Sequence, residues 1–215
     1  MKKNIIKTAL VLLAGLSFAS CDLTEPMQVQ ADKTMIFGTE SGLKTYSWSF
    51  YKMLPNIEDS FLQENGKVDY FVVRKMNNFF IDGAYTAETS TSWSWGNLRN
   101  VNYFLDGLKS KECTVDAKTV AHYEGLARWF RALFYFDKLT TYGEVPWFDK
   151  ELQNYEFDLM YKDRDSRDVI VKNIIADLDF AYENIQTTSS TGRSLVPKWA
   201  AAGLKSRVRL FEASC

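Results

Sequence analysis

The sequence predicts an all-α protein, built as an irregular stack of antiparallel helices. Apolar residues recur at intervals of three and four along several long segments, which is the spacing of one helix face. Polar, turn-forming stretches separate these segments, and no convincing series of strands accompanies them. Helix pairs joined in this way pack as solenoids or irregular bundles, although no strict repeat of about 34 residues is visible. The composition, 46% hydrophobic and 15% aromatic over 215 residues, is that of a folded protein.

A helix over residues 124–142 is predicted to lie at the centre of the stack. Most of its positions are apolar or small, which is too much apolar surface for a helix on the outside of a protein. We therefore expect it to lie between other helices. Gly143 is the expected C-cap, and Pro146 prevents the helix from restarting. Its polar side chains are spaced three and four apart and share one stripe. They are Glu124, Arg128, Arg131, Tyr135, Lys138 and Tyr142.

Four further helices are predicted, and they are listed here in chain order: residues 39–54, 95–109, 166–185 and from Pro197 onward. Thr39 is the expected cap of the first helix, and Pro55 stops it. The segment Val68–Val73 fits either a short strand or the middle of a helix. The polar run Thr86–Ser94 is expected to be an exposed loop.

The last two predicted helices each have an assigned core side. For residues 166–185 it consists of Val171, Ile174, Ile175, Leu178, Tyr182 and Ile185. For the final helix it consists of Trp199, Ala200, Leu204, Val208 and Phe211.

Residues 1–20 are typical of an export signal. Three lysines accompany an apolar run, Thr8–Phe18, that is too short to cross a bilayer. The residues before Cys21, Phe18-Ala19-Ser20, resemble a bacterial lipobox, which implies cleavage before Cys21 and lipidation of that residue. The alternative is an ordinary secretory cleavage after Ala19. No second apolar run is of spanning length, so we expect a lipid-anchored protein that does not cross the membrane.

Three parts of the chain follow from these signals. Residues 1–20 are the predicted lipoprotein signal peptide, and residues 21–38 are the predicted lipidated N-terminus and tether. Residues 39–215 form the predicted helical domain. The acidic start of the tether, at Asp22, looks like the surface-export signals of Bacteroidetes-type lipoproteins.

Charge and residue types exclude several classes of function. Without the three lysines of the leader, 23 basic residues stand against 27 acidic ones, a formal charge of about −4 that argues against nucleic-acid binding. His122 is the only histidine and is expected on a helix surface; no cysteine pair has metal-ligand spacing, and no phosphate-binding loop is present. We expect no enzyme activity, metal or cofactor. Cys113 and Cys215 can pair with each other, pair outside this sequence or stay free.

The order of motifs resembles that of the SusD/RagB family of outer-membrane nutrient-binding lipoproteins. The Arg-rich aromatic helix at residues 124–142, followed by Tyr142-Gly143-Glu144-Val145-Pro146, is similar to the family's signature. Four further segments resemble other family motifs and together with it cover nearly all of residues 21–213. They are Cys21 to Pro26, Leu98–Leu105, Asp177-Leu178 with Ala181, and Gly192-Arg193 with Ala200–Leu210.

The resemblance implies a helical scaffold with tetratricopeptide-like hairpins, followed in longer members by a loop-rich portion. That second portion is missing here, and we expect the chain to be a truncated product or a fragment. The resemblance also implies a cell-surface glycan- or nutrient-binding lipoprotein of the outer membrane. Such a protein acts with a SusC-like TonB-dependent transporter in polysaccharide uptake. The alternative is a helical-repeat scaffold lipoprotein that binds only protein partners. A third function, a surface glycosidase, would need two facing carboxylates.

Trp93 and Trp95 are the candidate ligand-binding residues, with Asn97 and Asn100 following them. Sugars stack their apolar C–H faces on aromatic rings, while their hydroxyls bond amides. The resemblance adds that glycan sites of the family use an arc of aromatic rings, partly from this region. The alternative for Trp95 is that it is the first core residue of its helix. The asparagines fit packing or a solvated helix face equally well.

Glu124, Arg128 and Arg131 allow two interpretations. They can form a ligand clamp, or they can form a structural ion pair along one helix face, with Glu124 and Arg128 one turn apart. We favour the structural ion pair.

Overall fold

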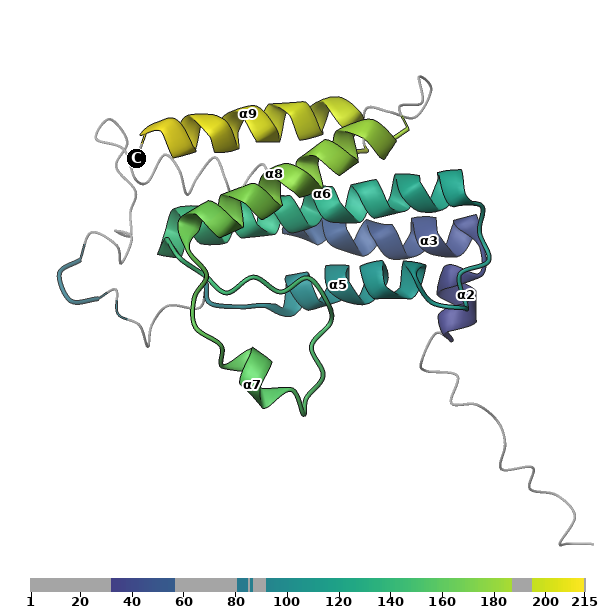
Figure 1. Cartoon of the computed structure of the whole chain (residues 1–215), viewed down its shortest axis with the longest axis horizontal. Helices are drawn as coiled ribbons and strands as arrows, with labels where there is room; N and C mark the ends of the chain where they lie inside the picture. The colour runs from purple at the N-terminus through teal and green to yellow at the C-terminus, as the bar shows by residue number, and fades with distance from the viewer. Residues whose placement is uncertain (1–31, 57–80, 85, 87–91, 187–194, 215) are drawn as a thin grey trace, which may run out of the picture. The chain divides into compact units, whose positions relative to one another are not determined.

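Helix α6 (Ala117–Tyr142) runs through the middle of a stack of helices, as Figure 1 shows. On one side of it lie α3 (Glu40–Ser47) and α5 (Gly96–Leu108). On the other side lie α8 (Arg167–Asn184) and α9 (Lys198–Ser214). Along the chain, α5, α6, α8 and α9 alternate in direction. The predicted all-α stack with this helix at its centre is confirmed.

The computed structural model describes residues 32–56, 81–84, 86, 92–186 and 195–214. Three shorter elements complete the described part: α2 (Lys33–Phe37), the 3₁₀-helix η2 (Trp48–Met53) and α7 (Phe157–Met160). Within these residues, β pairing is limited to an isolated bridge between Val145 and Asp165. The leader, Cys21, Val68–Val73, Cys215 and most of the loop predicted at 86–94 lie outside the described residues.

Side-chain and glycine caps explain where α6 begins and ends. The helix starts seven residues before Glu124 because the Asp116 carboxylate caps it, accepting the N–H groups of Lys118 and Thr119 at 3.1 and 3.0 Å. It ends where predicted. Gly143 has a φ of 73°, and its N–H donates to the Leu139 carbonyl at 2.9 Å.

The first predicted helix is split. Thr39 caps α3 as expected, its hydroxyl accepting the N–H of Gly42 at 3.1 Å. The chain then tightens into η2 from Trp48, which brings Phe50 into the core. Residues of the expected tether also belong to the folded unit, since α2 lies there and Phe37 is fully buried. The folded unit therefore begins at Lys33, within the predicted tether.

The core sides predicted for the last two helices are partly wrong. Tyr182 and Trp199 are 40% and 59% exposed and pack against each other edge to face, with ring centroids 5.8 Å apart. Ile174, Leu178 and Ile185 of the predicted side of α8 are buried, and Ile170, Asp177 and Ala181 are buried with them. Asp177 is buried because it pairs with Arg131 of α6. The face of α8 that packs on α6 therefore contains Asp177 and leaves Tyr182 at its edge.

Candidate functional site

A buried ion pair joins the two helices that pack most extensively, α6 and α8. The Arg131 guanidinium donates twice to the Asp177 carboxylate, at 2.7 Å in both bonds. Arg131 is 7% exposed and Asp177 only 2%. Burial disfavours the charge of Arg131, but the bonds from Asp177 hold the pKa of the guanidinium above its ordinary value. The pair is bidentate, which is the strongest geometry available to a guanidinium and a carboxylate.

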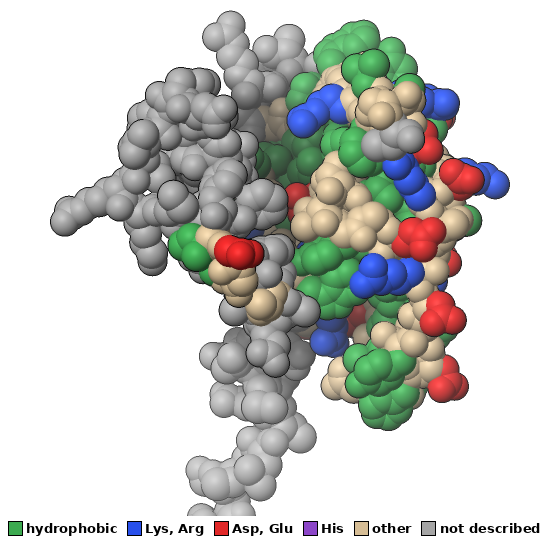
Figure 2. Space-filling model, turned by 90° about the vertical axis from the view of Figure 1, so that its left-hand side faces the viewer, with side chains coloured by type: hydrophobic (Ala, Val, Ile, Leu, Met, Phe, Trp, Pro, Cys, Tyr) green, Lys and Arg blue, Asp and Glu red, His purple; other side chains and the backbone are tan. Residues whose placement is uncertain are grey.

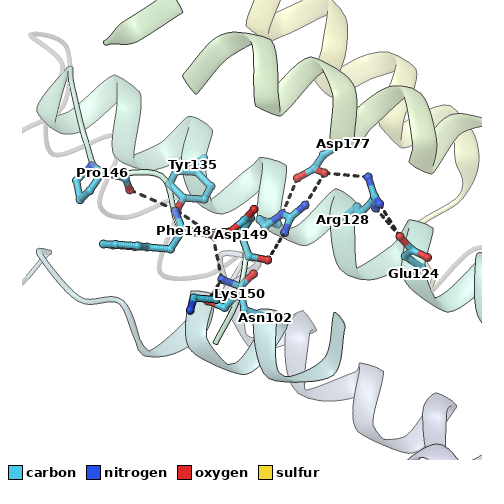
Figure 3. A network of polar contacts seen from close by, with 10 residues as sticks. Asn102, Glu124, Arg128, Tyr135, Pro146, Phe148, Asp149, Lys150 and Asp177 are labelled. Atoms are coloured by element: carbon cyan, nitrogen blue, oxygen red, sulfur yellow. Dashed lines mark hydrogen bonds and ion pairs between the residues drawn. The ribbon is translucent and has the colours of Figure 1, made fainter. Parts of the chain in front are cut away.

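The predicted ion pair of Glu124 and Arg128 is present next to it. Arg128 donates to Glu124 at 2.6 and 2.8 Å, and its guanidinium also lies 3.6 Å from Asp177 (Figure 3). Arg131 belongs to the same network, but its partner is on α8 and not on its own helix. The polar stripe of α6 is thus a helix-to-helix contact.

The same stripe holds the segment that follows α6. The N–H of Phe148 donates to the Tyr135 hydroxyl at 2.6 Å, and Arg131 donates to the Asp149 carbonyl at 3.3 Å. Trp147 stacks on the Tyr135 ring with centroids 4.1 Å apart. Burial raises the pKa of Tyr135, so its hydroxyl stays protonated. Figure 3 shows the hydrogen bonds that reach the segment 146–150 from α6.

Asn102 of α5 completes this support from the opposite side. Its side-chain amide donates to the carbonyls of Phe148 and Lys150, at 2.9 and 3.0 Å. The residue is 1% exposed. An amide within an apolar helix stripe is a signal that the sequence contains. The partners of Asn102 lie more than 40 residues away in the chain, so they could not be predicted from that signal.

A pocket of about 540 Å³ opens between the start of α5 and the connection that these bonds hold. Its apolar wall consists of Trp93, Trp95, Leu98, Pro146, Phe148, Leu152, Met160 and Tyr161. Its polar side chains are Arg99, Asn102, Lys150, Asn154, Lys162 and Arg164. Most of the wall is apolar or aromatic and a few polar groups converge on it, which is the usual composition of a small-molecule site.

The structure brings two of the four predicted ligand-binding residues into this pocket. Trp93 is 41% exposed and meets Trp95 edge to face at 5.2 Å. Trp95 is half-buried and also packs on Phe134 and Phe148, with centroids 5.6 and 5.5 Å away. It is therefore both a core residue of its helix and part of the pocket wall.

Asn97 and Asn100 lie elsewhere. Asn97 lines a separate hollow beside Trp129 and Leu133. The Asn100 side chain accepts the Tyr46 hydroxyl at 2.6 Å and donates to the Ser49 hydroxyl at 2.8 Å. These contacts pack α5 against the first helices. Burial, with smaller contributions from Tyr103 and Glu151, raises the pKa of Tyr46 to about 12.

Comparison with known proteins places the chain in a family. The model of the SusD-like family described as starch-binding and associating with the outer membrane matches residues 40–210. The chain belongs to this SusD-like family. Among curated proteins, none matches it.

Two solved SusD-like structures share the fold. A SusD-like protein from Bacteroides fragilis superposes with a TM-score of 0.68 at 24% identity, over 86% of this chain and 37% of that one. A laminarin-binding SusD-like protein superposes with a TM-score of 0.61 at 18% identity, over 81% of this chain and 40% of that one. The chain thus spans well under half the length of either solved protein.

The basic residues of the SusD-like pocket, which the sequence analysis did not single out, come from α5 and from the connection 149–165. Three of them have acidic neighbours: Arg99 lies 3.1 Å from Glu151, Lys150 lies 2.5 Å from Glu156, and Lys162 lies 2.6 Å from Asp165. The fourth, Arg164, lies over the Trp93 ring, 5.4 Å from its centroid.

Asp165 holds the two ends of the connection together by hydrogen bonds. Its carboxylate accepts the Lys162 ammonium and the Trp147 N–H, both at 2.6 Å. Burial works to raise the pKa of Asp165, but these two donors outweigh it and hold the pKa below its ordinary value. At neutral pH the carboxylate is charged and keeps Lys162 beside the pocket.

The side chains that line the pocket suit the binding of a small molecule. An aromatic wall with amide and cationic donors around it can hold a sugar by stacking and hydrogen bonds.

Within the described residues, no group of three His, Cys, Asp or Glu side chains could hold a metal ion. His122 is partly buried and accepts the N–H of Gln186 at 3.0 Å, and burial lowers its pKa. No described helix is long and apolar enough to cross a membrane.

Proposed function

We propose that this chain binds a glycan at the surface of the outer membrane, with the Trp93–Trp95 pocket as its binding site. The observation that carries the proposal is the pocket itself. Two Trp side chains form an apolar wall beside amide and cationic donors, in a chain whose family is described as starch-binding. One SusD-like structure of the same fold binds laminarin, which supports a glycan as the kind of ligand.

The rigidity of the wall supports the same proposal. Trp95 is fixed by Phe134 and Phe148, while Phe148 is fixed in turn by bonds to Tyr135 and Asn102. A ring that is already held loses little freedom when a sugar stacks on it, which favours binding. Trp93 stands at the edge, packed against the Tyr142 ring at 4.8 Å, and keeps 41% of its surface exposed.

The proposed partner is a SusC-like TonB-dependent transporter, on which the chain would act as a lid. The proposed anchor is lipid on Cys21, outside the described residues. Two or more acyl chains hold a protein firmly at a membrane, which keeps the pocket near the transporter. We expect mass spectrometry of the mature N-terminus to find acyl groups on Cys21; an unmodified N-terminus after Ala19 would instead support ordinary secretion.

Trp93→Ala is expected to weaken glycan binding about tenfold, which corresponds to about 1.4 kcal/mol of lost stacking and apolar burial. Affinity electrophoresis of the full chain in gels containing a panel of polysaccharides measures this as a loss of retardation. Trp199→Ala is the matched control, because Trp199 is also an exposed Trp but lies on α9, away from the pocket.

The two variants also separate the rival functions. Equal retardation of both would place the binding site elsewhere. A chain that no polysaccharide retards, but that co-purifies with a β-barrel transporter, would support the scaffold that binds only protein.

A further inference from the structure

The charged side chains that line the pocket all have the same sign. Arg99, Lys150, Lys162 and Arg164 line it, and none of the lining residues is Asp or Glu. Figure 2 shows the end of the molecule that faces left in Figure 1. In its described part, Lys and Arg lie among apolar side chains at the left and centre, and others stand beside Asp and Glu toward the right-hand edge. A neutral sugar needs no such excess of cations beside its stacking wall.

The acidic neighbours of three of these cations lie outside the lining of the pocket. Glu151, Glu156 and Asp165 pair with Arg99, Lys150 and Lys162, but none of the three acids lines the pocket. The Arg99 and Lys150 side chains are 57% and 47% exposed. Exposed pairs of this kind contribute little to stability, so a ligand anion can share or replace the carboxylate at small cost.

Arg164 differs from the other three. Among the residues that the structure describes, no carboxylate lies within ion-pair distance of its guanidinium, which instead lies over the indole of Trp93. A guanidinium is planar and donates two parallel hydrogen bonds to a carboxylate or a sulfate. Because the guanidinium covers one face of the Trp93 indole, its donors lie next to the remaining surface of the Trp93–Trp95 wall on which a sugar would stack.

We propose that the pocket takes an anionic glycan, one whose sugars carry carboxylate or sulfate groups, and that Arg164 is the main ligand of the anion. Lys162, Lys150 and Arg99, each beside a carboxylate, are further donors that line the pocket around it. This inference rests on the proposed function, because it names the class of glycan for the same site. A sugar ring stacks on the Trp wall, and its acidic substituent meets the guanidinium next to it.

The first test is affinity electrophoresis of the full chain against matched polysaccharides. Uronate polymers are polygalacturonate and alginate, sulfated polymers without carboxylates are carrageenan and dextran sulfate, and neutral polymers are laminarin, starch and galactan. We expect stronger retardation by at least one anionic polymer than by every neutral one, and the two anionic groups separate carboxylate from sulfate. Retardation by neutral polymers alone overturns this inference but keeps the proposed function. Retardation by none overturns both.

The second test changes the charge of Arg164. Arg164→Gln is expected to weaken binding of the retarding anionic polymer about tenfold, while Arg164→Lys loses less because it keeps the charge without the planar fork. Arg209→Gln, an exposed arginine of α9 outside the pocket, is the matched control and is expected to bind normally. Poly-glutamate is the polyanion control. If poly-glutamate binds as well as the glycan, or if Arg164→Gln and Arg209→Gln behave alike, the inference is wrong.

Discussion

Asp177→Ala is expected to lower the free energy of unfolding by about 3–5 kcal/mol. The substitution leaves the Arg131 guanidinium, which is 7% exposed, without the carboxylate that accepts two of its hydrogen bonds. Removing one partner of a buried pair costs this much because an uncompensated charge stays away from water. Urea denaturation of the full chain, followed by the far-ultraviolet circular dichroism of its helices, measures the change.

Asp179→Ala is the matched control for this prediction. Asp179 lies on the same helix and pairs with Lys205 of α9, but its side chain is 50% exposed. Solvent-exposed ion pairs contribute about 0–1 kcal/mol to the free energy of unfolding, so this change is expected to have a small effect. Equal effects of the two substitutions would mean that burial does not set the strength of the Arg131 pair, and would contradict our account of the α6–α8 contact.

A double variant separates the cost of a lone charge from the value of the pair. Replacing Arg131 with Met and Asp177 with Leu removes both charges together, and such exchanges are often neutral or stabilising. The pocket is expected to suffer all the same, because Arg131 also donates to the Asp149 carbonyl. The segment 146–150 forms part of the pocket wall and would lose one of its supports.

The helices could be predicted from the sequence because their signals are local. Thr39, Gly143 and the spacing of apolar residues fix ends and faces within a few turns of the chain. The polar stripe of α6 was visible for the same reason. Its main partner was not, because Asp177 lies 46 residues beyond Arg131 and becomes a neighbour only when α8 packs on α6. Without that contact the predicted face of α8 included the exposed Tyr182 and omitted the buried Asp177.

In the candidate site, too, the local signals could be predicted from the sequence and the long-range contacts could not. Two Trp residues separated by one residue at the end of a polar loop are a local signal, and both rings line the pocket. The basic residues at 150–164 lie in a connection without helical periodicity, so their meeting with Trp93 depends on the bonds from Tyr135 and Asn102. Asn97 and Asn100 follow Trp95 closely in sequence, but the turn of α5 directs them away from the pocket.

Phe37→Ala is expected to lower the free energy of unfolding by about 3–5 kcal/mol, although Phe37 lies in the segment predicted to be a tether. The ring is fully buried and packs between Tyr103 and Phe104 of α5, with centroids 6.0 and 5.8 Å away. Truncation removes this apolar contact and leaves a cavity that the surrounding helices fill only in part. Met35→Ala, on the same short helix but 70% exposed, is the matched control for urea denaturation.

Gly107 of α5 gives this prediction an independent check. A Cβ at Gly107 would lie 1.9 Å from the Phe37 ring, so Gly107→Ala is expected to destabilise the protein by about 1–3 kcal/mol. In the Phe37→Ala background the same methyl group meets open space, and its cost should fall or reverse. A double-mutant cycle measures this coupling. Additive effects would show that Phe37 does not lie against α5, whereas strong coupling would establish that the folded unit begins within the segment predicted to be a tether.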